Sequence, residues 1–284
     1  MLAHAKESST ERCENEYAAL RRAVLCPPRF MEIKEVINDV QESYKDENID
    51  IEKAMVQHAA FVDALQRNGV DTLLIKPVPK FPEQVFTRDI GFTIGETVFL
   101  GSMASEIRQG EEENLKHLLE DRRIPFERLS GTPMEGGDVL LDHNKIFVGI
   151  SSRTSEQAIQ ELQQKLPNHH VLPIPFNEKY LHLDCVFNIL SPTEALIFPE
   201  ALSSKTINQL SEHYDLIRVN REEQFSLGVN VLSIGDKRVF SQPQNVGVNR
   251  QLASRGYQVI EVDFSEIIKS GGAFRCCTMP LVRD

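Results

Sequence analysis

A repeated pattern of two short apolar strands, a helix and a third strand is the feature that most restricts how this chain can fold. Four short polar turns, each flanked by apolar runs typical of hairpin strands, lie at 94–97, 142–145, 191–194 and 234–237. The pattern therefore recurs about every 45 residues, a period typical of duplicated supersecondary units.

A helix and a third strand are predicted after each hairpin. Apolar residues three and four positions apart indicate the helices, and Ser155 and Ser203 are suitable caps at the start of two of them. The third strands are predicted from short apolar runs at 171–174, 216–219 and 259–262. The repeated unit is therefore ββαβ.

The N-terminal part of the chain predicts a degenerate fifth unit, with a strand at 23–25 and a helix from about 35 to 57. Each unit buries its apolar face against its neighbours. Five units can close into a ring, with the helices outside and a central cavity lined by several units. We therefore expect one α/β domain over 1–284. A single open α/β sheet is the alternative, although no glycine-rich nucleotide motif is present to support it.

Charge and cysteine content narrow the function classes. Asp and Glu number 42 against 31 Lys and Arg, and the net charge of -11 disfavours nucleic acid and anionic membranes and suits a cationic ligand. The five cysteines are scattered and odd in number, so free thiols are expected. The first seven residues lack the apolar core of a signal peptide, and no apolar run approaches the roughly 20 residues that span a bilayer. We expect a cytoplasmic protein.

Three polar clusters in apolar surroundings contain the residue types of covalent catalysis. A glycine pair at 271–272 leads to Cys276, a candidate nucleophile. The other clusters are Glu135-Gly136-Gly137-Asp138 and His182-Leu183-Asp184. In a strand, alternation would place His182 and Asp184 on one face, so that a general acid and a carboxylate lie together.

Four segments, in this order along the chain, resemble the guanidino-modifying enzymes, which include dimethylarginine dimethylaminohydrolase, arginine deiminase and the amidinotransferases. They are Val85-Phe86-Thr87-Arg88-Asp89, Glu135-Gly136-Gly137-Asp138-Val139-Leu140, His182-Leu183-Asp184 and Gly271-Gly272 with Cys276-Cys277-Thr278. The resemblance covers nearly the whole chain. It implies a five-bladed α/β propeller, or pentein, of ββαβ units around a central active-site cavity, which the spacing of the repeats also predicts.

The resemblance implies a role for each residue. Cys276 would attack the guanidinium carbon, and His182 would protonate the departing amine and then activate water, with Glu135 as the active-site acid. A guanidinium is planar and offers paired N–H donors, which suits the carboxylates of Asp89 and Asp184. The remaining substrate-binding candidates are Arg153 and Arg108 for an α-carboxylate, and Asp138, which could instead fasten the glycine turn.

Two departures from the family pattern bear on the substrate. The chain has no room for the inserted helical domain of arginine deiminases, which favours the shorter dimethylarginine hydrolase type. The residue before the nucleophile is Arg275, where the deiminases usually have histidine, and its side chain could lie beside the thiol or point outward. Several motifs nevertheless look closer to arginine deiminase. We expect conversion of methylated arginine to citrulline and an amine through a thiouronium intermediate.

Other functions stay open at this point. Arginine deiminase-like hydrolysis or amidino transfer on another guanidine would use the same intermediate, and a catalytically silent guanidine-binding protein would keep only the fold. A metal site of His182, Cys185 and one of Cys276 and Cys277 is a weaker alternative, because strand alternation would separate His182 from Cys185. We expect a small guanidine ligand, no cofactor and no metal; assembly into a homo-oligomer is left open.

Overall fold

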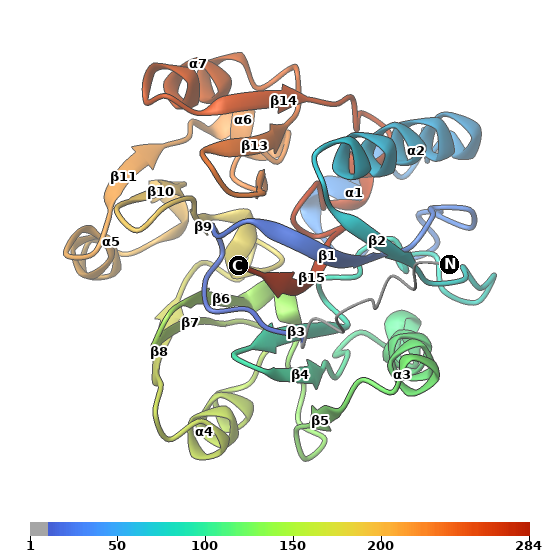
Figure 1. Cartoon of the computed structure of the whole chain (residues 1–284). Helices are drawn as coiled ribbons and strands as arrows, with labels where there is room; N and C mark the ends of the chain where they lie inside the picture. The colour runs from blue at the N-terminus through green and yellow to red at the C-terminus, as the bar shows by residue number, and fades with distance from the viewer. Residues whose placement is uncertain (1–10) are drawn as a thin grey trace, which may run out of the picture.

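The computed structural model describes residues 11–284 as a mixed α/β fold of five three-stranded sheets. The sheets lie around a common centre, and the longer helices lie at the periphery (Figure 1). The N-terminal seven residues, from which the absence of a signal peptide is predicted, fall outside the described part of the chain. None of the helices in residues 11–284 is both long and apolar enough to cross a membrane.

Four sheets are built from consecutive ββαβ units, as the spacing of the turns predicts. In each unit the first two strands pair antiparallel and the third joins the second in parallel after a helix. The units are β3 (Gly91–Ile94), β4 (Thr97–Leu100), α3 (Glu111–Arg122) and β5 (Phe126–Arg128); β6 (Val139–Asp142), β7 (Lys145–Ile150), α4 (Glu156–Lys165) and β8 (His170–Pro175); β9 (Phe187–Ile189), β10 (Glu194–Ile197), α5 (Ser204–Ser211) and β11 (Asp215–Arg218); and β12 (Leu232–Ser233), β13 (Arg238–Ser241), α7 (Val246–Ser254) and β14 (Gln258–Glu261).

Local sequence explains where these helices begin. Ser155 accepts a hydrogen bond from the backbone of Ala158 at the start of α4, and Ser203 does the same for Thr206 at the start of α5. Each cap satisfies a backbone donor that has no partner inside the helix. Both predicted caps are confirmed. A further short helix, α6 (Arg221–Phe225), connects β11 to β12.

The fifth sheet joins the two ends of the described chain. Its middle strand is β1 (Leu20–Leu25), which pairs antiparallel with β15 (Met279–Arg283) and parallel with β2 (Asp71–Leu74). The C-terminal strand therefore takes the place of the missing first strand of the N-terminal unit. Because this pairing links the two ends, it closes the ring of units and brings the segment just before β15 to the centre of the molecule.

The helix expected from about 35 to 57 is interrupted, which corrects the prediction. The structure has α1 (Asp39–Tyr44) and α2 (Ile51–Arg67), separated by a short connection. Asn48 in that connection has φ 57°, which ends the helical path, and Asp50 then accepts from the backbone of Lys53 to cap α2. The six residues of α1 thus lie apart from α2 and contact the 3₁₀ turn Ile267–Ser270.

An aromatic cluster supports the chain beside the predicted nucleophile. The ring of Phe274 stacks on Phe264 with centroids 4.4 Å apart and meets Phe61 edge-on at 5.3 Å. All three rings are buried in the largest hydrophobic core. Since Phe274 precedes Cys276 by two residues, core packing fixes the backbone that presents the thiol.

Candidate active site

The segment that carries Cys276 follows a short 3₁₀ turn, Ile267–Ser270, and two glycines. Gly271 has φ 91°, a left-handed conformation that side chains with a Cβ rarely adopt. A Cβ on Gly272 would lie 2.4 Å from the ring of Phe86. The glycine pair singled out in the sequence is therefore needed for the turn and for a close approach to Phe86, and Cys276 emerges from it 2% exposed.

The Cys276 sulfur lies among an amide, a carboxylate and a second thiol. Its Sγ is 3.1 Å from Nδ2 of Asn230 and 3.5 Å from Oδ2 of Asp184. A hydrogen bond with Cys185, burial and the Asp184 carboxylate raise the pKa of the Cys276 thiol well above its ordinary value. This environment therefore favours the protonated thiol over the thiolate.

Asn230 is a site residue that sequence reasoning missed. Its side-chain oxygen accepts from the backbone N–H groups of Ala273 at 3.2 Å and Cys276 at 3.1 Å, while its amide group reaches the thiol. It thus holds both the backbone and the sulfur of the nucleophile. In the sequence, the only signal for Asn230 is that it is a single amide between two valines in an apolar run. That pattern does not indicate a functional role unless the fold is known.

His182 and Glu135 form a buried pair. Nε2 of the imidazole is 2.7 Å from Oε2 of Glu135, and Nδ1 is 3.7 Å from Oδ1 of Asp89. Burial, the largest influence, opposes a charged ring, but Asp89 and the bond to Glu135 outweigh it and raise the pKa of His182 to about 10. The imidazole is therefore protonated at neutral pH and can act as a general acid.

The local structure around His182 differs from the prediction. His182 is extended but is followed at once by a 3₁₀ turn, Leu183–Cys185, so 182–184 is not a strand and alternation does not apply. The turn is fastened by Asp138, whose carboxylate accepts from the backbone of Leu183 at 2.9 Å and from Ser151 at 2.6 Å. This geometry favours the fastening role for Asp138 over contact with a substrate.

Close approach also explains the glycines before Asp138. A Cβ on Gly137 would lie 2.7 Å from both Oδ1 of Asp89 and Cγ of His182. A larger residue would push the aspartate and the imidazole apart. The Glu-Gly-Gly-Asp sequence thereby brings residues from three distant segments together.

Asp89 is held by an arginine from the neighbouring loop. Nη1 of Arg108 is 2.7 Å from Oδ2 of Asp89, and its other edge meets Oε2 of Glu111 at 2.9 Å and 3.1 Å. Oδ1 of Asp89 has no hydrogen-bond partner among the described residues. Because both edges of its buried guanidinium meet carboxylates, Arg108 is placed to orient Asp89; binding of a substrate carboxylate by Arg108 stays a prediction.

Asp184 is held in the same manner by the residue before the nucleophile. Nη1 of Arg275 is 2.7 Å from Oδ2 of Asp184, and its Nη2 is 3.2 Å from Oε1 of Glu16. Oδ1 of Asp184 faces two thiols, Cys185 at 3.6 Å and Cys276 at 3.8 Å. Arg275 is therefore turned into the molecule, which answers the question that the sequence left open.

Arg153 lies at the edge of the site. Its Nη2 donates to the carbonyl of Ile37 at 3.1 Å, and its Nη1 is 3.8 Å from Oε1 of Glu135 without a hydrogen-bond partner in the described chain. The side chain also borders a hollow of about 340 Å³ with Lys179 and Leu181. A substrate carboxylate at Arg153 stays a prediction, with a free donor that could serve it.

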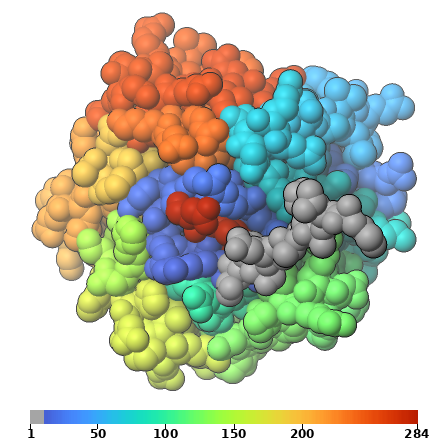
Figure 2. All heavy atoms as spheres, in the orientation of Figure 1, coloured from blue at the N-terminus to red at the C-terminus, as the bar shows by residue number. Residues whose placement is uncertain are grey.

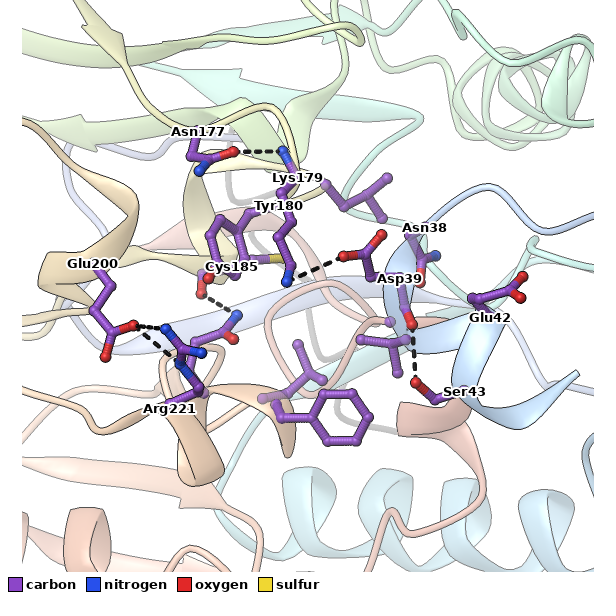
Figure 3. Close-up of a pocket in the computed structure, with 16 residues that line it drawn as sticks. Asn38, Asp39, Glu42, Ser43, Asn177, Lys179, Tyr180, Cys185, Glu200 and Arg221 are labelled. Atoms are coloured by element: carbon purple, nitrogen blue, oxygen red, sulfur yellow. Dashed lines mark hydrogen bonds and ion pairs between the residues drawn. The ribbon is translucent and has the colours of Figure 1, made fainter.

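A larger cavity of about 590 Å³ adjoins this hollow and reaches Cys185, the neighbour of the nucleophile. Figure 3 shows Lys179 and Asp39 facing each other in this cavity, where Nζ is 3.4 Å from the carboxylate. Asp39 is the first residue of α1. Two hydrogen bonds attach this segment: the Asn38 side chain donates to the carbonyl of Ser270, and the Gln41 side chain donates to Glu83. The segment from 37 to 44 therefore forms a lid over the nucleophile turn.

One group of potential metal ligands occurs among the described residues: Asp89, Glu135 and His182, with ligand atoms within 4.8 Å of one another. It contains no cysteine, so it differs from the site weighed in the sequence analysis. In this structure the two carboxylates pair with side chains: Glu135 pairs with His182, and Asp89 pairs with Arg108. The geometry thus gives each acid an internal cationic partner.

Comparisons with known proteins agree with this arrangement. A family model described as N,N dimethylarginine dimethylhydrolase, eukaryotic, matches residues 27–283. The chain is 50% identical over 271 residues to the uncharacterized protein YkgA of Bacillus subtilis, covering 95% of both. It is 26% identical to the dimethylarginine dimethylaminohydrolase of Mycobacterium tuberculosis, covering 92% of this chain and 86% of that one.

A solved structure extends the comparison. The N-terminal domain of ArgZ, an arginine dihydrolase from the ornithine-ammonia cycle in cyanobacteria, is similar with a TM-score of 0.85. A variant of that domain, covalently bound to a reaction intermediate, is 25% identical and covers 92% of this chain, which in turn covers 98% of it. The likeness extends over nearly all of both chains.

Proposed function

The chain belongs to the dimethylarginine dimethylhydrolase family, an enzyme family of arginine and dimethylarginine hydrolases, and we propose that it converts methylated arginine to citrulline and methylamine or dimethylamine. The overall arrangement that we propose for it is a five-bladed α/β propeller, supported by five three-stranded sheets with a common ββαβ order. A cytoplasmic location is part of the proposal and is supported by five free cysteines.

One observation carries the proposal. Asp89 and Asp184 each give one carboxylate oxygen, Oδ2, to an internal arginine, and the recorded contacts leave Oδ1 without an arginine partner. Oδ1 of Asp89 lies 3.7 Å from His182, and both oxygens of Asp184 lie near the Cys276 sulfur, Oδ2 at 3.5 Å and Oδ1 at 3.8 Å. Two such oxygens suit the N–H edges of one guanidinium, whose carbon would then lie beside the thiol.

The first half-reaction begins when the cation binds between these carboxylates. Its positive charge offsets the negative potential that keeps the Cys276 thiol protonated, so the thiol releases its proton to water. Sγ then attacks the guanidinium carbon. As the tetrahedral intermediate collapses, the C–N bond to the methylated nitrogen breaks, and protonated His182 donates its proton to the departing amine. A thiouronium on Cys276 results.

The second half-reaction needs the histidine as a base. Having given up its proton, His182 is neutral and held by Glu135, and it removes a proton from a water molecule that attacks the thiouronium carbon. The C–S bond breaks, the thiol is restored, and the product is the ureido group of citrulline. Glu135 keeps the imidazole oriented and stabilises its charged form in both steps.

Arginine deiminase-like activity is the second candidate, because ArgZ, with a similar fold, is described as an arginine dihydrolase. The same attack on unmethylated arginine would release ammonia. Amidino transfer would follow if an amine, in place of water, resolved the thiouronium. These reactions pass through the same thiouronium on Cys276 and differ only in the leaving group or the acceptor.

Citrulline formation by the purified protein tests the proposal, with arginine, monomethylarginine and asymmetric dimethylarginine assayed in parallel. We expect turnover of the methylated substrates and its complete loss in Cys276→Ala. Cys13→Ala is a matched control that removes a buried thiol outside the site. Turnover of arginine alone would favour the deiminase reaction. Activity on none of the three, with or without an added amine acceptor, would contradict the proposal.

A further inference from the structure

The segment just before β1 supplies an acid to the centre of the molecule. It lies before residue 27, where the family match begins. The segment is attached to three units by backbone bridges of Arg12 to Val282, Cys13 to Gly95, and Asn15 to Asp142. Figure 2 shows the N- and C-terminal segments together filling the middle of one face. The segment thus covers the side of the centre where β1 and β15 lie.

Glu16 enters from this segment and is buried between arginines. Its Oε1 accepts from Nη2 of Arg88 at 2.7 Å, from Nη2 of Arg275 at 3.2 Å and from the backbone of Leu141 at 3.1 Å. The side chain is 6% exposed. All three contacts are made by Oε1, and two of the donors are arginines. A buried charge is tolerated when it has such cationic and hydrogen-bond partners.

Arg275 connects this acid to the reaction centre. One edge of its guanidinium meets Glu16 and the carbonyl of Val139, the latter at 2.8 Å, and Nη1 meets Oδ2 of Asp184 at 2.7 Å. Asp184 in turn lies 3.5 Å from the Cys276 sulfur. A continuous series of charged contacts therefore runs from the N-terminal segment to the nucleophile.

We propose that Glu16 and Arg275 are positioning residues for the hydrolysis of guanidines: Glu16 holds Arg275, and Arg275 fixes the carboxylate of Asp184 beside Cys276 through one oxygen and leaves the other oxygen free of an arginine. The inference rests on the proposed function and deepens it. Neither residue contacts the substrate. Their second effect is electrostatic, because the negative charge of Glu16 offsets part of the positive charge that Arg275 brings to the region of Cys276.

The Glu16→Gln variant separates this role from simple packing. The amide keeps the shape of the side chain but removes its negative charge, so the positive charge of Arg275 acts more strongly on Asp184 and on the thiol. We expect the KM for a guanidinium substrate to rise about tenfold with kcat changed less than about threefold, since a cation is bound less tightly. We also expect alkylation of Cys276 by iodoacetamide at pH 7.5 to be about 3- to 10-fold faster.

Glu14→Gln is the matched control, because Glu14 lies two residues away and pairs with Arg12 at the surface. It should leave the alkylation rate and the kinetic constants unchanged. If Glu16 had a purely structural role, Glu16→Gln would lower the melting temperature but leave the alkylation rate and KM the same as in Glu14→Gln. That result would overturn the proposal.

If Glu16→Gln does not fold, the Arg275→Lys variant tests the same proposal. A lysine keeps the charge but cannot meet Glu16 and Asp184 with two separate edges. We expect KM to rise about tenfold with little change in alkylation rate; wild-type kinetics would overturn the proposal. If the unchanged protein turns over no guanidine, the proposed function fails, while alkylation of Glu16→Gln against Glu14→Gln still decides the electrostatic part of the inference.

Discussion

Two groups of three ionisable residues lie beside the nucleophile and the catalytic histidine, and they share one arrangement but differ in charge. In one, Asp89 pairs with Arg108, which also holds Glu111; in the other, Asp184 pairs with Arg275, which also holds Glu16. Each aspartate therefore has its carboxylate oriented by a buried arginine that a glutamate fixes from behind.

The two groups differ in the balance of their charges. Glu111 shares one arginine with Asp89, and burial, which outweighs that arginine, raises the pKa of Glu111 to about 8. Glu16 is also buried, yet Arg275 and Arg88 outweigh the burial and lower the pKa of Glu16 to about 2. The same side chain is thus harder to ionise in one group and easier to ionise in the other. Several arginines lie near Glu16, whereas Glu111 has one arginine and two neighbouring acids, Glu83 and Asp89.

Loss of either aspartate should have the largest effect. We expect Asp89→Asn and Asp184→Asn each to lower kcat/KM for citrulline formation on the order of 10³-fold, because the amide no longer attracts the guanidinium carbon to the thiol. Asp142→Asn is the control; its carboxylate accepts from two tyrosines outside the site. Retention of a tenth of the wild-type kcat/KM by either variant would contradict the assigned roles.

Loss of the arginines should distinguish the two groups by stability. Arg108→Gln leaves Asp89 and Glu111 without their cation, and we expect the free energy of unfolding to fall by about 3 to 5 kcal/mol. Arg275→Gln leaves Asp184 unpaired, but Glu16 keeps Arg88, so a smaller fall of about 1 to 3 kcal/mol is expected. Urea unfolding at pH 7 measures both. The reverse order would show that Arg88 does not compensate.

Loss of the glutamates should give pH dependences of opposite sign. Because the folded-state pKa of Glu16, about 2, is below its ordinary value of 4.5, Glu16 stabilises the fold above pH 4.5, and this contribution disappears as the pH falls toward 2. Glu16→Gln should therefore lower the free energy of unfolding at pH 7 by about 3 kcal/mol, and the difference should shrink in acid.

Glu111 behaves in the opposite way. Its folded-state pKa of about 8 is above 4.5, so its ionisation disfavours the fold increasingly from pH 4.5 to pH 8. The free energy of unfolding of Glu111→Gln should therefore rise relative to the wild type over that interval. The expected rise is about 1 kcal/mol per pH unit, up to a few kcal/mol in total. Urea unfolding from pH 2.5 to pH 8 tests both glutamates, Glu16 below pH 4.5 and Glu111 above it. If the free energy of unfolding changed with pH in the same way in both variants, the two groups would not differ in their balance of charges.

The smallest effect is expected at the lid. The Lys179 and Asp39 side chains are each more than half exposed, in contrast to the buried pairs below them. We expect Lys179→Gln to change the free energy of unfolding by at most about 0.5 kcal/mol. A double-mutant cycle with Asp39→Asn measures the pair directly. A coupling above about 1 kcal/mol would mean that the lid contact is as strong as the buried ones.

The sequence-based predictions were most successful where local patterns carry the information. The hairpin turns, the caps Ser155 and Ser203 and the order of elements in four units follow from spacing and side-chain chemistry, and the structure confirms them. The fifth unit was predicted only in part, because its first strand comes from the other end of the chain. No local signal connects residues 20–25 with 279–283.

The candidate site shows the same division. Cys276, His182, Glu135, Asp89 and Asp184 were identified from motifs, and the fold brings them together. Arg108 was a candidate for substrate binding, and Asp138 was a candidate either for substrate binding or for fastening the glycine turn. Their buried hydrogen bonds favour the orientation of Asp89 and of the His182 turn. Asn230 and Glu16 were missed, since a lone amide and a lone acid have no motif.

The sequence by itself determined the repeat, the residue types available for covalent chemistry and the glycines that permit close approach. Only the tertiary structure decided which carboxylate oxygens are held and which are left for a ligand, which way Arg275 turns and how strongly each acid is ionised. The physical reason is that spacing and turn chemistry act over a few residues, whereas burial and charge pairing depend on groups as far apart as Glu16 and Arg275.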